Sequence, residues 1–391
     1  MKKVWDKWTR IALVKRILVG LILGAILGIA VPQATGIAIL GDVFVSALKA
    51  IAPLLVFFLV ISSLCNAGKS HGGVIKTVII LYMFSTVLAA VIAVFASMAF
   101  PVKMTLANAA TDTSAPQGIV EVLNNLLLNV VANPVSSLVN ANYVGILMWA
   151  VLLGLAFRAA DKMSKKVLAD VADGISIVVT WIINLAPFGI FGLVFNTVST
   201  NGLDIFTTYG KLLILLVGCM LFIYFVTNPL LVYWCIRQNP YPLIFHCLKR
   251  SALTAFFTRS SAANIPVNMK VCEEMGLDRD TYSVTIPLGA TINMDGAAIT
   301  ITVMTMATAF TLGIHVDIPT AIILSLLAAL SACGASGVAG GSLLLIPMAC
   351  SLFGISDDIS MQVVAVGFII GVVQDSVETA LNSSSDLLLS A

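Results

Sequence analysis

The chain has 391 residues, of which 59% are hydrophobic and only 10% are charged, and its mean hydropathy is +1.05. A soluble domain carries about 25% charged residues, so this composition excludes an ordinary cytosolic enzyme and an intrinsically disordered protein. The net charge of +2 gives no reason to expect a nucleic-acid partner. The seven cysteines are scattered without a CxxC pair and are interpreted as reduced, small apolar residues. We therefore predict an all-α polytopic membrane protein.

The apolar segments predict eight transmembrane helices and two re-entrant helical hairpins. A helix that crosses the roughly 30 Å hydrocarbon core needs about 20 apolar residues. Two apolar stretches, 245–268 and 321–353, have polar or glycine-rich centres and are expected to enter the membrane and turn back. The fourth predicted span is too long for one crossing and contains Asn133-Pro134, where we expect a break. The predicted spans are 11–31, 42–64, 74–99, 117–157, 167–196, 209–236, 281–313 and 360–391.

Basic residues predict the orientation, because lysine and arginine concentrate on the cytoplasmic side of a membrane. Residues 1–16 hold six of them, which predicts a cytoplasmic N-terminus before a first span that is not a cleaved signal peptide. With eight crossings, seventeen basic residues fall in predicted inner segments and two, Lys103 and Lys211, in outer loops. We expect a multi-pass protein of the cell inner membrane with both termini in the cytoplasm.

The run TRSSAANIP at 258–266 interrupts the first predicted hairpin. Ser260 and Ser261 offer hydroxyl groups there, and a turn would free backbone polar groups. Such backbone at membrane depth is tolerated only where it faces protein or a water-filled cavity. A serine-containing surface loop is the alternative, but apolar sequence flanks the motif on both sides. The pattern therefore favours a polar cavity at the tip of this hairpin.

The run GATINMDG at 289–296 lies in the middle of the predicted span 281–313. Adjacent asparagine, aspartate and glycine break helical hydrogen bonding and free carbonyl oxygens, while Asp295 supplies a buried negative charge. Oxygen-only ligands suit a hard cation. The alternative is a polar residue that a neighbouring helix satisfies. The motif predicts a broken helix that binds a cation.

The run SACGASGVAGGS at 331–342 interrupts the second predicted hairpin. Glycine permits unusual backbone angles and a close approach to a ligand. The alternative is a glycine-rich packing interface between helices. We expect this hairpin to approach a ligand closely and to be able to move.

The last predicted span carries a polar stripe of Asp375, Thr379, Asn382 and Asp386, with Glu378 at its edge. These four positions fall on one side of a helix that turns by about 100° per residue. Carboxylates within a membrane helix must face a cavity or another polar surface. A solvated face outside the membrane is the alternative, which the apolar flanks VVAVGFIIGVV and LLL disfavour.

A polar hairpin followed by a polar break in a helix occurs twice, first at 258–266 and 293–296, then at 331–342 and 375–386. The first hairpin opens from the inner side and the second from the outer side. This order predicts an inverted repeat, an arrangement in which substrate and ion sites lie near the membrane midplane.

The motifs TRSSAANIP and NMDG, together with the polar stripe, resemble the dicarboxylate/amino-acid:cation symporters, which include the glutamate transporters. The resemblance covers essentially the whole chain and is strongest to bacterial members that couple sodium to serine and threonine. It implies a glutamate-transporter-like homotrimer that moves substrate by an elevator mechanism. The scaffold would comprise 1–70 and 101–208, and the transport domain 71–100 and 209–391.

The resemblance also implies three sodium sites. One would use Asn293, Asn382 and Asp386 with the carbonyl of Gly289. The ligands of the second would be Tyr82, Ser85, Thr86, Asn293 and Asp295, and those of the third would be Thr291 with carbonyls near Ala332, Cys333 and Ala335. Sodium would be a co-transported ion and not a catalytic cofactor.

For the substrate, the resemblance implies that Asp375 binds the α-amino group and that Asn382, Ser261 and the amide near Val338 bind the α-carboxylate. Ser260, Glu378 and Thr379 complete the predicted substrate site. Relatives that carry acidic substrates have arginine where this chain has Glu378, and threonine where it has Ala297. Two like charges about 4 Å apart repel by about 4 kcal/mol at an effective dielectric near 20. We therefore expect sodium-coupled uptake of small neutral amino acids, with serine and threonine favoured.

The intramembrane charges Arg259, Asp295, Asp375, Glu378 and Asp386 sum to −3 when all are ionised. Bound cations would have to balance this charge, although Glu378 could instead be protonated or paired with Arg259. The main alternative function is a sodium- or proton-coupled symporter of acidic amino acids or dicarboxylates. An ion channel lined by the stripe, a carrier of cationic amino acids such as lysine, and an intramembrane hydrolase that uses two aspartates are weaker alternatives.

Overall fold

The computed structural model describes residues 11–66, 73–106, 127–128, 131–203, 205–333 and 340–391, and the regular elements there are helical. The first half contains α2 (Leu13–Ala30), η1 (Thr35–Ile37), α3 (Ala38–Asn66), α4 (Gly73–Ala99), α6 (Pro134–Val139), α7 (Tyr143–Ala156), η2 (Phe157–Ala159), α8 (Lys162–Asn184) and α9 (Ala186–Asn201).

The second half contains α10 (Ile205–Phe222), η3 (Ile223–Thr227), α11 (Asn228–Ile236), α12 (Tyr241–Cys247), η4 (Leu248–Ala252), α13 (Leu253–Thr258), α14 (Ser261–Glu274), α15 (Arg279–Ile292), α16 (Asp295–Thr311), α17 (Ile318–Ala332), η5 (Gly341–Leu345), α18 (Ile346–Ser351) and α19 (Asp357–Ser390).

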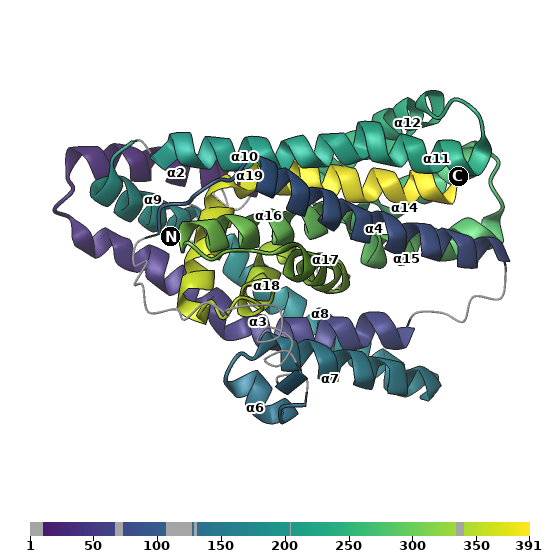
Figure 1. The fold of residues 1–391 in the computed structure, drawn as a ribbon, viewed down its shortest axis with the longest axis horizontal. Coiled ribbons are helices and arrows are strands. Elements are labelled where there is room, and N and C mark those ends of the chain that lie inside the picture. The colour runs from purple at the N-terminus through teal and green to yellow at the C-terminus, as the bar shows by residue number, and fades with distance from the viewer. Residues whose placement is uncertain (1–10, 67–72, 107–126, 129–130, 204, 334–339) are drawn as a thin grey trace.

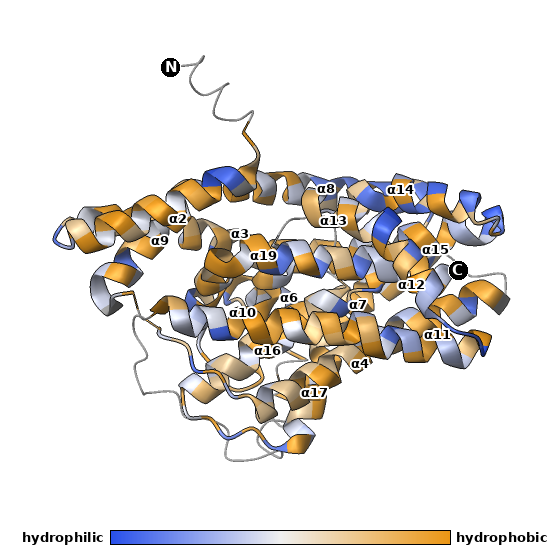
Figure 2. Ribbon diagram, turned by 90° about the horizontal axis from the view of Figure 1, so that it is seen from above, coloured by the Kyte–Doolittle hydropathy of each residue, from blue (hydrophilic) through white to orange (hydrophobic). Residues whose placement is uncertain are grey.

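Six helical stretches in the described chain are long and apolar enough to span a membrane, namely 35–62, 74–99, 162–184, 205–236, 279–311 and 357–390. Figure 2 shows hydrophobic residues along most helices, while hydrophilic residues gather on α14. Exposed apolar side chains such as Ile22, Ile214 and Trp234 face outward from the bundle, as expected where lipid replaces water as the surrounding solvent. The chain is therefore a multi-pass helical membrane protein.

The predicted spans 117–157 and 167–196 differ most from the helices observed. Asn133 caps the start of α6 and Pro134 is its first residue, so the expected break at this dipeptide is confirmed. The predicted span 167–196 is divided at Leu185 into α8 and α9. Pro187 explains this division, because proline lacks the backbone N–H that would continue the helix.

The predicted break in the span 281–313 is confirmed. Helix α15 ends at Ile292 and α16 begins at Asp295, and the backbone of Asn293 and Met294 between them is not helical. The stretch 245–268 is also interrupted, since α13 ends at Thr258 and α14 begins at Ser261. Arg259 between them has a left-handed backbone with φ of 52°.

Short polar side chains set where several helices begin. Asp278, Asp317 and Ser356 each accept a hydrogen bond from the backbone N–H three residues later, at the starts of α15, α17 and α19. Such caps satisfy N–H groups that have no partner within the helix. Hydrogen bonds from the hydroxyl and amide of Thr281 lower the pKa of Asp278.

Helices α16 and α19 form the centre of the molecule. Figure 1 shows α19 running through the bundle beside α10, α4 and α16, with α6 and α7 beyond α3 at the edge of the molecule. All residues from Asp295 to Ala309 on α16 are buried. Because these two central helices carry the polar motifs, their side chains meet inside protein and not in lipid.

Candidate functional site

The polar stripe on α19 is buried along its whole length. Asp375, Thr379, Asn382 and Asp386 are 3%, 6%, 3% and 1% exposed. This burial excludes the alternative of a solvated helix face. Each of these groups therefore needs a polar partner inside the protein.

The break between α15 and α16 lies directly against this stripe. The backbone N–H of Gly296 donates to Asn382 Oδ1 at 2.7 Å. A Cβ atom added to Gly296 would lie 2.9 Å from Glu378 Cγ and 3.0 Å from the Glu378 backbone oxygen. Glycine is thus required for the first turn of α16 to approach α19 this closely.

Asn293 and Asp386 meet at the base of the break. Asn293 Nδ2 donates to Asp386 Oδ1 and to Ser385 Oγ, each at 2.9 Å. The other amide atom, Asn293 Oδ1, is buried and has no hydrogen-bond partner among the described residues. The carbonyl of Gly289 accepts a hydrogen bond from the Asn293 N–H at 2.9 Å, which leaves that oxygen one further acceptor position.

Helix α4 supplies hydroxyl groups to two carboxylate-bearing positions. Ser85 Oγ donates to Asp295 Oδ2 at 2.8 Å, and Thr86 Oγ1 lies 3.2 Å from Asp295 Oδ1. The hydroxyl of Tyr82 instead lies 3.0 Å from the backbone oxygen of Asp386 and 2.6 Å from Ser390 Oγ. Tyr82, which was predicted as a ligand of the second sodium site, therefore places its hydroxyl group beside Asp386.

Asp375 joins the two predicted hairpins. Nε and Nη2 of Arg259, at the tip of the first, each lie 2.6 Å from Asp375 Oδ2. The N–H of Gly340, in the glycine-rich run of the second, donates to Asp375 Oδ1 at 3.2 Å. The possibility that Arg259 pairs with Glu378 is therefore wrong. Arginine at this tip cannot be assigned a partner from sequence, because the two carboxylates lie within one helical turn of each other.

Glu378 is surrounded by neutral donors. Its Oε2 atom accepts from Thr300 Oγ1 at 2.7 Å, from Ser342 Oγ at 2.9 Å and from Gln374 Nε2 at 2.5 Å. Thr300, Ser342 and Gln374 were not predicted as site residues. Only Gln374 left a signal in the sequence, since it is a polar residue one helical turn before Glu378, directly after the apolar run VVAVGFIIGVV.

The remaining predicted positions are less tightly grouped. Thr291 donates to the backbone oxygen of Leu288, and Cys333 Sγ lies 3.8 Å from the backbone oxygen of Ile292, close to the end of α17 at Ala332. Thr379 donates to the Asp375 backbone at 2.8 Å. Ser260 caps α14, and Ser261 is buried in the first turn of that helix. Ala335 and Val338 lie outside the described residues.

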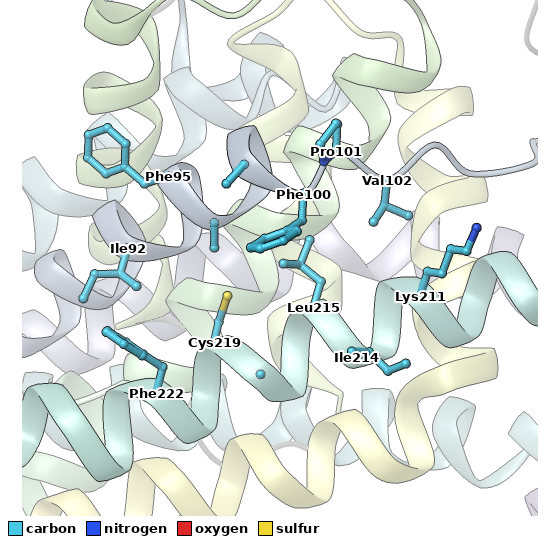
Figure 3. A pocket seen from close by; sticks show the side chains of 13 residues that line it. Ile92, Phe95, Phe100, Pro101, Val102, Lys211, Ile214, Leu215, Cys219 and Phe222 are labelled. Carbon is cyan, nitrogen blue, oxygen red and sulfur yellow. The ribbon is translucent and has the colours of Figure 1, made fainter.

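A cavity of about 860 Å³ lies between α4 and α10, away from all these groups. Figure 3 shows Phe95, Phe100, Ile214 and Phe222 along its walls and Lys211 at one end. It contains none of the predicted site residues. In the described chain, no three His, Cys, Asp or Glu side chains gather as they would to hold a metal ion, and all seven cysteines are free. The polar centre is instead built mainly of amide, hydroxyl and carboxylate oxygens.

The comparisons with known proteins agree with this geometry. Residues 13–391 match the model of the sodium:dicarboxylate symporter family. The serine/threonine transporter SstT of Bifidobacterium adolescentis is 58% identical over all of this chain and 91% of its own length. The SstT proteins of two Streptococcus thermophilus strains are 55% identical over all of this chain and 98% of their length. The chain therefore belongs to the sodium:dicarboxylate symporter family.

Proposed function

We propose that this protein uses a sodium gradient to take up small neutral amino acids, with serine and threonine favoured. The carrying observation is the buried Glu378 beside Asn382 and Asp375 on α19, since an acidic substrate would bring a second negative charge to this carboxylate. The names of the serine/threonine relatives support the same substrate class.

In this proposal the substrate amino group binds Asp375, which now pairs with the guanidinium of Arg259. The ammonium group of the substrate would then replace the guanidinium of Arg259 as the cation beside the Asp375 carboxylate. Asn382, Ser261 and the amide near Val338 would bind the substrate carboxylate, and Ser260 and Thr379 would line the site. The side chain would then extend toward Glu378.

Sodium would bind at the oxygen clusters around the broken helix. Asn293 Oδ1 supports one site, because a buried carbonyl oxygen without a partner is costly unless a ligand satisfies it. Asp386, Asn382 and the Gly289 carbonyl would complete this site. Asp295 with Ser85 and Thr86 would form the centre of a second, to which Tyr82 and Asn293 would contribute. Carbonyl, carboxylate and hydroxyl oxygens suit a hard cation of this kind.

A third sodium ion would bind between Thr291 and the end of α17. The supporting contact is the approach of Cys333 to the backbone oxygen of Ile292, which brings the C-terminal end of α17 close to the end of α15. The negative end of a helix dipole and its free carbonyl groups favour a cation there. Carbonyls near Ala332, Cys333 and Ala335 would serve as ligands.

Bound sodium would also permit the substrate-loaded site to move. Arg259, Asp295, Asp375, Glu378 and Asp386 carry a net charge of −3 when all are ionised, and a neutral zwitterion does not change it. Moving this charge through a layer of low dielectric is unfavourable unless cations balance it. Sodium binding and amino-acid transport would be coupled through this requirement.

The fold proposed for this function has eight spans and two re-entrant hairpins, with a scaffold of 1–70 and 101–208 and a transport domain of 71–100 and 209–391. The break between α15 and α16 and the turn at Arg259 support this division, because both of these polar segments lie within the proposed transport domain. We further propose a homotrimer in the cell inner membrane, both chain termini cytoplasmic, and an elevator movement of the transport domain.

The test is uptake of labelled serine into proteoliposomes with an inward sodium gradient, with a potassium gradient as the control. Unlabelled threonine and alanine should compete, whereas aspartate should compete about a thousandfold less well, the ratio that corresponds to about 4 kcal/mol. Aspartate that competes as well as alanine or threonine contradicts the substrate assignment and favours an acidic-substrate symporter. Lysine as competitor tests for a cationic substrate.

A further inference from the structure

The described residues hold Glu378 through only one of its two carboxylate oxygens. Thr300, Ser342 and Gln374, which we call the Glu378 clamp, all donate to Oε2. A carboxylate oxygen offers about two lone-pair sites, so three donors saturate Oε2. Within the described residues no group donates to Oε1.

The clamp comes from three different elements, which fixes the carboxylate in space. Thr300 lies in the second turn of α16, Ser342 in η5, and Gln374 one helical turn before Glu378 on α19. Gln374 Nε2 also donates to Thr300 Oγ1 at 2.7 Å, so two members of the clamp hold each other. All three side chains are at most 1% exposed.

The direction of the Gln374 amide is set by charge. Its Nε2 atom faces Glu378 Oε2, while its Oε1 atom is buried and has no hydrogen-bond partner. The reverse orientation would place a carbonyl oxygen against a carboxylate oxygen. The protein thus leaves one buried acceptor unsatisfied in order to keep an N–H donor on Glu378, which is costly unless the placement of that carboxylate matters.

We propose that Thr300, Ser342 and Gln374 are positioning residues that fix Glu378 through Oε2 and thereby present Oε1 as the acceptor for the hydroxyl of the transported amino acid. This inference rests on the proposed function. It adds that the preference for serine over alanine, which differ only in this hydroxyl, depends on three residues that do not touch the substrate themselves. A site built to hydrogen-bond a hydroxyl discriminates strongly against an analogue that lacks it.

Ser342 gives the clamp a link to the second hairpin. Ser342 lies in η5, which begins directly after Gly340, and the N–H of Gly340 donates to Asp375. Contacts from this segment therefore reach both the carboxylate proposed for the substrate amine and the one proposed for its side chain. The clamp is complete only when η5 lies against α19 as it does in this structure.

The experiment determines the concentration of serine, and that of alanine, that halves sodium-driven uptake, and compares the two as a ratio. It is done in Thr300→Val, Ser342→Ala and Gln374→Ala. Valine has nearly the shape of threonine, and Thr302→Val is the matched control, because Thr302 lies on the same helix, is equally buried and has a hydroxyl without a partner. We expect each clamp variant to weaken serine relative to alanine by about tenfold, with alanine affinity within about twofold of wild type. Thr302→Val should keep the wild-type ratio.

Equal losses for serine and alanine would mean that the clamp supports only the fold, and an unchanged ratio would mean that it does not position the acceptor. Either result overturns the inference. Alanine uptake verifies folding of each variant, and Ser342→Ala is the smallest change if Thr300→Val or Gln374→Ala is not produced. Absence of sodium-driven serine uptake in the wild type is a different result, which overturns the proposed function itself.

Discussion

At the scale of residues, the site depends on two carboxylates that lie within one helical turn of each other and have partners of different charge. Asp375 has a cationic partner in Arg259, whereas Glu378 has only neutral donors. The first can exchange one cation for another, so it suits a substrate ammonium. No described residue donates to the other oxygen of Glu378, so Glu378 suits a hydroxyl. Residue identity alone, an aspartate and a glutamate three positions apart, does not distinguish these roles.

Asp386→Ala tests whether the C-terminal end of the polar stripe on α19 binds sodium. We expect the sodium concentration for half-maximal serine uptake to rise by about tenfold or more, because a charged, hydrogen-bonded oxygen ligand is lost. The order of serine, threonine and alanine as substrates should stay the same. Initial uptake rates at varied sodium concentrations measure both quantities.

Ser376→Ala is the control for this variant, since in the described part of the chain the Ser376 hydroxyl bonds only to the backbone of its own helix at Val372. An unchanged sodium dependence in Asp386→Ala removes Asp386 from the sodium site. A changed substrate order with normal sodium dependence would move it to the substrate site instead.

At the scale of elements, small residues set how closely helices approach. A Cβ atom added to Gly24 of α2 would lie 2.6 Å from the backbone oxygen of Phe191 on α9, and Gly20 and Gly28 meet the same helix. The repeat of glycine every four residues is thus a packing face, as small residues are in membrane helices generally.

Gly24→Ala should therefore lower the melting temperature of the detergent-solubilised protein. Overpacking costs about 1–3 kcal/mol, and the backbone oxygen in contact cannot rotate away as a side chain could. The gain of about 1 kcal/mol in helix propensity offsets only part of this cost. Thermal unfolding followed by intrinsic fluorescence measures the shift.

Gly174→Ala is the matched control, because Gly174 lies within α8 and a Cβ atom there meets nothing within 4 Å. This variant should be as stable as wild type or more so. A Gly24→Ala protein that melts at or above the wild-type temperature would show that α2 and α9 can separate at little cost.

At the scale of the whole molecule, α19 of the proposed transport domain also touches the proposed scaffold. Phe368 on α19 packs edge-on against Phe44 on α3, with ring centroids 5.3 Å apart. Lys49 Nζ on α3 lies 3.0 Å from Asp357 and 2.7 Å from Asp358, at the start of α19. An elevator movement would break these contacts, so they favour the conformation of this structure over others.

Lys49→Met should shift the balance between conformations with little loss of stability. Exposed ion pairs contribute about 0–1 kcal/mol, which is a factor of at most about five in the ratio of two states. Energy transfer between fluorophores placed on α3 and α14 would measure that ratio in proteoliposomes. High salt should reduce the difference between variant and wild type, because salt screens exposed charges.

Lys76→Met is the control, since Lys76 is an exposed lysine of α4. It should leave the ratio of conformations unchanged. Equal effects of both substitutions would assign the shift to net charge and not to the pairs of Lys49 with Asp357 and Asp358.

The sequence by itself determined that this protein is surrounded by lipid, and it determined two of the positions at which its helices break. Apolar length requires a membrane, and the residues of NMDG and Asn133-Pro134 interrupt a helix by local chemistry. The burial of the α19 stripe also followed, because carboxylates with helical spacing in an apolar segment must face protein. Each of these properties depends on neighbours close in the chain.

Only the tertiary structure decided which polar groups are partners. Arg259 bonds to Asp375 across 116 positions, and Thr300 and Ser342 reach Glu378 across 78 and 36. It also decided how the region 117–196 divides into helices. Contacts of this kind depend on the rotation and crossing of packed helices, which many side chains fix together. A local pattern shows that a buried polar group needs a partner, but it does not contain the geometry that selects one.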